Sequence, residues 1–187
     1  MKILNTYLFE KRAQKYLSTT HRERRFVSYD YAKTVLLLFE SDISEKNPVI
    51  HKIIHSLQQD GKKVCAWGFI DKKEVATAIF PDFRILHHKQ TDFFQKPLPS
   101  YINELKDLKY DLLIDLTVQT FIPLEYVAMY ANASCKTGIR KTKLPIYDFI
   151  LDLDNMETSN ELPETPIDEL YLFNQIIFYL KSIQTSD

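Results

Sequence analysis

The sequence predicts a three-layer α/β domain, with helices on both faces of a doubly wound, mainly parallel sheet of five or six strands, Rossmann-like or flavodoxin-like. Two observations support this fold class. Short apolar runs of strand length alternate with segments whose apolar residues repeat every three or four positions. The chain has 187 residues, of which 45% are hydrophobic, and this is enough for one buried core.

Four apolar runs are the strongest strand candidates, because each is rich in Val, Ile, Leu or aromatic residues and is bounded by polar or turn-forming residues. Two further runs have the composition of strands over only four or five residues. In chain order, the six predicted strands are Thr34–Phe39, Lys63–Trp67, Arg84–His87, Asp111–Leu116, Cys135–Ile139 and Tyr147–Leu153.

Prolines and capping residues mark where the helices between these strands begin. Each start is followed by apolar residues at a spacing of three or four, which predicts a helix with one face on the sheet. Residues 71–80 are compatible with either a helical turn or irregular structure. The predicted helices run from Pro48 to before Gly61, from Ser100 to Leu108, from Pro123 to about Asn132, and from Pro166, with Thr165 as N-cap, past Leu180.

The chain divides into a basic helical arm, residues 1–32, and a single Rossmann-like α/β domain, residues 33–187. Residues 2–33 contain eight Lys or Arg and three acidic residues. Residues 152–169 contain seven acidic residues and no Lys or Arg, so this connection carries a strong negative charge. The formal net charge of −1 therefore hides two oppositely charged segments.

Composition excludes several classes of protein. No apolar run approaches the roughly 18 residues that a membrane-spanning helix needs. Glu10, Lys11 and Arg12 interrupt the place where a signal peptide has its apolar segment, so we expect a cytoplasmic protein. The three glycines are too scattered for a P-loop or a dinucleotide-binding turn. Two cysteines, Cys65 and Cys135, argue against a disulfide framework or a multi-cysteine zinc site.

Polar residues follow three of the predicted strands, where a doubly wound sheet binds its ligands. They predict a small-molecule site for a nucleotide or another phosphorylated ligand. Asp115 is its strongest member, because a carboxylate at a buried strand end needs hydrogen bonds or a cation; the alternative is that Asp115 only caps the following turn. The candidate ligand-binding residues are Glu40, Ser41, Asp42, Asp115, Thr117, Gln119, Arg140 and Lys141.

Four cations, Lys136, Arg140, Lys141 and Lys143, follow one another with no acidic residue between them. Such a cluster suits a phosphate, a nucleic acid or an acidic protein surface. The alternative is a solvated loop that the acidic residues after it neutralise.

The basic arm offers a second positively charged surface. Arg22, Arg24 and Arg25 lie near aromatic residues, a combination that suits a macromolecule or an anionic lipid surface. The alternative is a helix packed weakly on its own domain, because an apolar stripe that begins at Leu4 and Leu8 is interrupted by basic residues. A net charge of −1 makes nucleic acid unlikely as the main partner. The candidate macromolecule-binding residues are Arg22, Arg24, Arg25, Lys136 and Lys143.

Neither a metal site nor a catalytic nucleophile is predicted. His51 and His55 have the spacing of two zinc ligands on a helix, but Lys52 stands where the general base of a metalloprotease belongs. Both cysteines lie in or beside apolar strands, where burial raises the pKa of a thiol and makes it less reactive.

The segments YDLLIDL at residues 110–116, CKTGIR at 135–140 and YDFILD at 147–152, with an apolar helix between the first two, resemble a small uncharacterised bacterial family of unknown function. The resemblance runs from about residue 33 to residue 182. It implies a Rossmann-like α/β fold and no catalytic motif.

Residues 111–140 are also similar to the N-terminal half of heptosyltransferase-type glycosyltransferases, in which a strand, a helix and an Arg-Ile-Gly-like strand follow in this order. The loop after the first strand has no glycine here, and the chain is too short to contain the second, nucleotide-sugar-binding half. The resemblance therefore implies a shared fold and does not transfer the activity.

Taken together, the sequence predicts a non-catalytic binding or accessory domain that engages a protein, another macromolecule or a second copy of the chain. The alternatives are a small-molecule-binding domain for a nucleotide or phosphorylated ligand, and a degenerate glycosyltransferase-like half. No catalytic residue and no cofactor are predicted.

Overall fold

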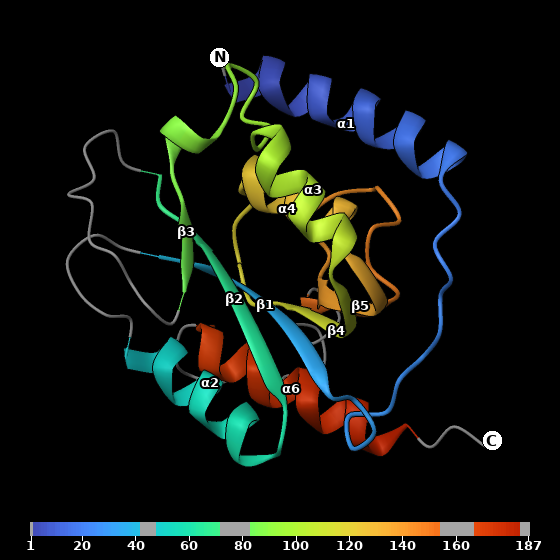
Figure 1. The fold of residues 1–187 in the computed structure, drawn as a ribbon, viewed down its shortest axis with the longest axis vertical. Coiled ribbons are helices and arrows are strands. Elements are labelled where there is room, and N and C mark those ends of the chain that lie inside the picture. Colours follow the sequence, from blue (N-terminus) through green and yellow to red (C-terminus); the bar gives the residue numbers. More distant parts are fainter. Residues whose placement is uncertain (1, 42–47, 72–82, 154–166, 184–187) are drawn as a thin grey trace.

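The computed structural model describes residues 2–41, 48–71, 83–153 and 167–183, and these residues form an open six-stranded sheet covered by helices (Figure 1). Every pair of neighbouring strands is parallel. The predicted fold class, a doubly wound Rossmann-like α/β arrangement, is thereby confirmed. The strands are β1 (Thr34–Glu40), β2 (Lys63–Phe69), β3 (Arg84–Leu86), β4 (Lys109–Asp115), β5 (Asn132–Ile139) and β6 (Phe149–Leu151).

The strand order, β3-β2-β1-β4-β5-β6, reverses once. The chain runs outward from β1 to β3, returns to place β4 beside β1, and then runs outward again to β6. Strands β1 and β4 therefore form the centre, with Leu38 of β1 beside Asp115 of β4 at their carboxyl ends. Both central strands are nearly continuous apolar runs because helices cover both of their faces.

Helices cover the sheet unequally. α2 and α6 lie on one face, and α3 and α4 lie on the other (Figure 1). α1 packs outside this second helical layer, against α4, so that face carries an additional helix (Figure 1). The bounds are α1 (Lys2–Thr19), α2 (Pro48–Gln59), α3 (Pro99–Asp107), α4 (Ile122–Tyr130) and α6 (Glu169–Ser182), with a short 3₁₀ helix at His88–Gln90.

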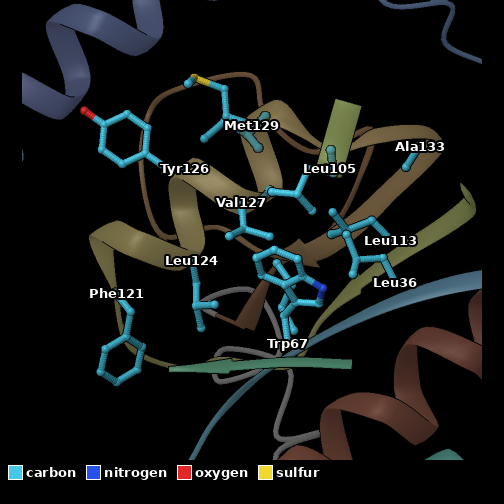
Figure 2. Close-up of a cluster of buried hydrophobic side chains, with 14 of the residues drawn as sticks. Leu36, Trp67, Leu105, Leu113, Phe121, Leu124, Tyr126, Val127, Met129 and Ala133 are labelled. Atoms are coloured by element: carbon cyan, nitrogen blue, oxygen red, sulfur yellow. The ribbon is translucent and has the colours of Figure 1, made fainter. Parts of the chain in front are cut away.

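Each face of the sheet has its own hydrophobic cluster. On the α4 side, Figure 2 shows Trp67 of β2 packed with Leu36 and Leu113 of the central strands, below Leu124 and Val127 of α4. The cluster on the opposite face joins alternate side chains of the same strands to the apolar faces of α2 and α6.

α1 is helical as expected, but its buried face is not the predicted one. Leu4 is 51% exposed, while Phe9 and Ala13 are buried. Phe9 meets the ring of Tyr126 edge-on, with 4.8 Å between ring centroids. These positions, four residues apart, lie on one side of the helix, whereas the basic residues that seemed to break the stripe are exposed.

Several predicted boundaries were wrong by a few residues. β5 begins at Asn132 rather than Cys135, so α4 ends earlier, at Tyr130. β6 covers only three residues of the predicted strand 147–153. His87 does not end a strand, because its side chain caps the 3₁₀ helix. α6 begins at Glu169 with Asp168 as N-cap, whereas Thr165, Pro166 and almost all of residues 71–80 lie outside the described residues.

Candidate ligand site at the carboxyl end of the sheet

A cavity of about 370 Å³ opens at the carboxyl ends of β2, β4 and β5, on the α4 side of the sheet. Loops after these strands, the beginning of α4 and the first half of α1 form its walls. The position is the one at which doubly wound sheets hold their ligands. Its lining residues are Asn5, Thr6, Glu10, Phe69, Asp71, Gln95, Gln119, Thr120, Phe121, Ile122, Pro123, Lys141 and Thr142.

A buried ion cluster lies behind the wall of this cavity and reaches it through Lys141. Asp115 is the last residue of β4, Glu125 lies in the first turn of α4, and Lys141 follows β5. The Lys141 Nζ lies 2.5 Å from Asp115 Oδ2 and 3.2 Å from Glu125 Oε1. The three side chains are only 0–3% exposed, so the cluster is closed to bulk water.

Two hydroxyl groups complete the cluster. Thr117 donates its backbone N–H and its hydroxyl to Asp115 Oδ1, at 2.9 and 2.7 Å, and accepts a hydrogen bond from Lys141 at 2.6 Å. The Tyr147 hydroxyl donates to Asp115 Oδ2 at 2.5 Å. Asp115 therefore caps the turn after β4, which is the alternative considered from the sequence, and it also pairs with a lysine of its own chain.

Gly138 of β5 lets Tyr147 approach Asp115. A Cβ atom at this position would lie 3.1 Å from Tyr147 Cε1 and 3.3 Å from Asp115 Cβ. Any side chain here would press on the hydrogen-bonded pair, so the close packing of the cluster requires glycine.

The charges of the cluster stabilise one another. Burial by itself lowers the pKa of Lys141, but Asp115 and Glu125 outweigh burial, and the pKa lies above its ordinary value. Burial raises the pKa of Glu125, and nearby Asp115 raises it further. Burial also raises the pKa of the Tyr147 hydroxyl well above its ordinary value. Lys141 is therefore firmly protonated, whereas one carboxyl of the cluster is biased toward its neutral form.

The arrangement fixes the loops around the cavity. Lys141 donates hydrogen bonds to Asp115 and Thr117, and it forms an ion pair, without a hydrogen bond, with Glu125. It joins the loop after β5 to the loop after β4 and to the first turn of α4. Because its charge is paired with two carboxylates, Lys141 positions the wall and is not available to neutralise a ligand.

The structure brings only some of the predicted ligand-binding residues together. Asp115, Thr117 and Lys141 come together in the ion cluster, and Gln119 lines the cavity. Arg140 and Glu40 are exposed, while Ser41 is buried after β1, and none of these three lines the cavity. Asp42 lies outside the described residues.

Glu125 and Tyr147 are cluster members that the sequence did not suggest. Glu125 had one visible signal, since it is a single carboxylate in a helix whose residues Ile122–Met129 are all buried. A carboxylate in such a helix needs a buried partner. Tyr147 gave no comparable signal, because aromatic residues are ordinary in strands.

The four cations that follow one another near β5 do not form one patch, which corrects the prediction of a single cluster. Lys136 is buried, and its Nζ donates to the carbonyl oxygens of Ala128 and Met129 at 2.6 and 3.0 Å. Lys141 belongs to the ion cluster at the other end of α4. Only Arg140 and Lys143 are exposed, so the alternative of a solvated loop also fails for half of the residues.

The arginines of the basic arm differ in their surroundings. Arg22 forms an ion pair with Asp148 at 2.5 Å and donates to the carbonyl oxygens of Ala133 and Ser134. Arg24 is 56% exposed and lies 3.6 Å from Asp148, and Arg25 is exposed. Arg22 thus attaches the arm to β5, while Arg24 and Arg25 remain candidates for contact with a partner.

Other predicted features have the following places. His51 is half-buried and His55 is exposed on α2. Within the described residues, no group of three or more His, Cys, Asp or Glu side chains could hold a metal ion. Burial raises the pKa of the Cys135 thiol to about 11. In the same part of the chain, no helix combines the length and the apolar character needed to cross a membrane.

Comparison with solved structures gives two distant similarities. The chain is 13% identical to a glycosyl transferase family 9 protein from Veillonella parvula DSM 2008, with a TM-score of 0.48, covering 87% of this chain and 44% of that one. It is 12% identical to D-2-hydroxyisocaproate dehydrogenase, with a TM-score of 0.31, covering 96% of this chain and 62% of that one. The chain thus spans less than two thirds of either protein.

Comparison with protein families gives a direct assignment. No curated protein matches the sequence. The profile of one family, described as a family of unknown function (DUF6913), matches residues 6–165, which is most of the chain. The resemblance to an uncharacterised family is thereby confirmed, and the chain belongs to the DUF6913 family.

Proposed function

We propose that this chain is a binding domain that holds a small, uncharged, hydroxyl-rich molecule in the carboxyl-end cavity. The observation that supports the proposal is the buried cluster of Asp115, Glu125 and Lys141, which lies behind the wall of that cavity and reaches it through Lys141. The cavity of about 370 Å³ is within the size range of small-ligand sites.

The energetic cost of the cluster favours a role in binding. Removing each charged group from water costs several kcal/mol, and apolar residues of similar volume often give equal or greater stability. The cluster holds three chain segments around one cavity, at the end of the sheet where ligands bind. Buried ionisable groups beside such a cavity are typical of functional sites, because they fix the positions of the groups that meet the ligand.

The side chains that line the cavity favour one class of ligand. It offers side-chain amides at Asn5, Gln95 and Gln119, together with carboxylates at Glu10 and Asp71. Among the described lining residues, Lys141 is the single Lys or Arg, and its charge is already neutralised. A phosphate would therefore meet carboxylates without a free cation, whereas hydroxyl groups can both donate to carboxylates and accept from amides. The lining thus favours an uncharged ligand over the phosphorylated ligand expected at this end from the sequence.

Asn5 gives the most specific support for a hydroxyl-bearing ligand. Its side chain is 96% buried at the cavity wall, and its Oδ1 has no hydrogen-bond partner within the described residues. A buried acceptor without a partner costs about 1–3 kcal/mol. A ligand hydroxyl that donates to this oxygen recovers that free energy.

Calorimetric titration with monosaccharides, inositol and glycerol tests the proposal. We expect at least one of them to bind saturably and to lose tenfold or more in affinity in Gln119→Ala, a lining variant outside the ion cluster. Gln58→Ala, on the exposed side of α2, is the matched control and should bind as the unmodified chain does. Absence of saturable binding to the whole panel, or equal binding by Gln119→Ala, would contradict the proposal.

A second candidate function is association with a macromolecular partner, for which a second copy of this chain is the simplest case. Exposed Arg24 and Arg25, beside the ion-paired Arg22, favour it. Sedimentation over a range of protein concentrations should then show self-association that the double variant Arg24→Glu, Arg25→Glu abolishes. A monomer at all concentrations would rule out the second copy as partner.

A further inference from the structure

A larger cavity, of about 670 Å³, lies at the opposite end of the sheet. Its walls come from the amino ends of β4 and β5, the last turns of α1, α3 and α4, and residues 20–24 of the basic arm. It shares no lining residue with the carboxyl-end cavity. We call it the basic cavity, because its lining includes Arg22, Arg24, Lys106, Lys109 and Lys136.

The cations of the basic cavity exceed the carboxylates near them. Among the described lining residues, Glu23 is the single acidic side chain. Asp148, behind the wall, pairs with Arg22 at 2.5 Å and more distantly with Arg24. Lys106 and Lys109 are exposed and form no ion pair within the described residues. The cavity therefore has a net positive charge that its own carboxylates do not neutralise.

Lys136 gives this cavity a buried, built-in donor. Its residue is only 2% exposed, and two of its three ammonium protons are used by the carbonyl oxygens of Ala128 and Met129. The third proton has no partner within the described residues, and Lys136 belongs to the cavity wall. A buried ammonium beside an open cavity can complete its hydrogen bonds with an anionic oxygen.

The helix ends at the basic cavity explain why some of its cations lie there. The carboxyl ends of α1, α3 and α4 meet at the basic cavity, and each carries a partial negative charge that attracts cations. Lys136 meets this need for α4 by direct hydrogen bonds. Lys106, however, lies over the rings of Tyr16 and Tyr130, with its Nζ 5.9 and 5.1 Å from their centroids. Lys106 therefore contacts aromatic rings, and Lys109 has no ion-pair partner within the described residues. In the described part of the chain, neither cation is bound to the carbonyl oxygens at the helix ends.

We propose that the basic cavity binds a small phosphorylated ligand. A phosphate monoester carries up to two negative charges and accepts several N–H donors at once, which matches Lys136 in the wall and Lys106, Lys109 and Arg24 at the rim. The volume of about 670 Å³ accommodates the rest of a molecule the size of a nucleotide or a sugar phosphate. The site is distinct from the carboxyl-end site, because the two share no lining residue and have opposite charge.

Calorimetric titration of the full chain with inorganic phosphate, glucose 6-phosphate and AMP tests this proposal. We expect saturable binding of at least one of them, and at least a tenfold loss of affinity in the double variant Lys106→Gln, Lys109→Gln. Both lysines are exposed, so the variant keeps the fold. The matched control is Lys52→Gln, Lys89→Gln, which removes two exposed lysines elsewhere and should bind as the unmodified chain does. Glucose 6-phosphate and AMP separate a sugar phosphate from a nucleotide.

Three outcomes would overturn the proposal. The first is the absence of saturable binding to all three compounds. The second is an equal loss of affinity in the control variant, which would indicate a general effect of charge. The third is binding of single-stranded RNA or heparin without binding of any small phosphate, which would indicate a macromolecular polyanion. Because Gln119→Ala lies outside the basic cavity, it should leave phosphate binding unchanged, and the two proposals fail separately.

Discussion

The two ends of α4 are each held by a buried lysine, and the two lysines have opposite surroundings. At the beginning of the helix, Lys141 lies between two carboxylates and its pKa is raised. At the end, Lys136 has only carbonyl oxygens as acceptors, and burial together with nearby Arg22 lowers its pKa to about 7. The comparison shows that burial alone does not decide what a lysine does. A buried lysine that is paired with carboxylates links chain segments, whereas one without a carboxylate partner keeps a donor for the anion that we propose.

The largest expected loss of stability comes from breaking the ion cluster at the beginning of α4. Asp115→Asn leaves Lys141 buried with Glu125 alone, and it weakens or removes the three further hydrogen bonds that Asp115 accepts from Thr117 and Tyr147. We expect the free energy of unfolding to fall by about 3–5 kcal/mol, the usual cost of leaving one member of a buried ion pair. Urea denaturation measures it. Asp107→Asn, at an exposed position on α3, serves as the control and should stay within about 0.5 kcal/mol of the unmodified chain. A similar small change for Asp115→Asn would show that the cluster is not a stabilising one.

Filling the space beside Tyr147 should have the next largest effect. In Gly138→Ala the added Cβ would lie 3.1 Å from the Tyr147 ring, so the ring must shift by a few tenths of an ångström and strain its hydrogen bond to Asp115. We expect a loss of about 1–3 kcal/mol in unfolding free energy, as for other overpacked sites. Ser134→Ala, on the same strand but away from the cluster, should cost less than about 0.5 kcal/mol. Equal stability of the two variants would mean that the contact between Tyr147 and Asp115 is not tight.

The pH dependence of stability probes the other end of α4. The folded chain releases the Lys136 proton near pH 7, whereas an unfolded lysine keeps it to about pH 10.5. Between these values the unfolded state binds more protons, so stability should rise with pH, by roughly 1 kcal/mol per unit. Measurements between pH 7 and 8.5 avoid Cys135, whose raised pKa acts in the opposite direction above about pH 9.

Lys136→Met is the control for that trend. Methionine has similar length and no titrating group, so the unfolding free energy of the variant should be nearly constant over the same interval. The carbonyl oxygens of Ala128 and Met129 lose a donor, which lowers the absolute stability without changing the slope. An unchanged slope in the variant would assign the pH dependence to another group.

The smallest effect is expected at Glu125. Because burial raises the pKa of its carboxyl, keeping this group ionised at neutral pH is unfavourable in the folded state. Glu125→Gln removes that cost and keeps the shape of the side chain. The free energy of unfolding should therefore change by less than about 1 kcal/mol, which is much smaller than the loss expected for Asp115→Asn. A loss as large as that of Asp115→Asn would show that both carboxylates are required as charges.

Sequence patterns predicted the sheet well because the central parallel strands contain short apolar runs, residues 35–39 in β1 and 112–114 in β4. The bounds of these two strands differ from prediction by at most two residues at either end. The stripe of α1 was misread because a helix on the outside of another helix buries only a narrow face, here Phe9 and Ala13. Local periodicity does not show which narrow face another helix will cover.

The candidate site was predictable only in part. Asp115, Thr117 and Lys141 follow strands, so topology alone brings them to one end. Glu125 and Tyr147 join them through packing of α4 and through the approach that Gly138 permits, which single-sequence patterns do not encode. Lys136 was expected on a surface because lysine usually is exposed, and its burial follows from the orphaned carbonyl oxygens at the end of α4.

α1 belongs to both cavities. Its first half lines the carboxyl-end cavity through Asn5 and Glu10, and its last turn lines the basic cavity through Tyr16. At 18 residues, the helix is a rod of about 27 Å that spans the distance between them. A displacement of this rod alters both walls at once. Two ligands that each bind more tightly when α1 is docked would therefore strengthen one another's binding by the same factor, although the two never touch.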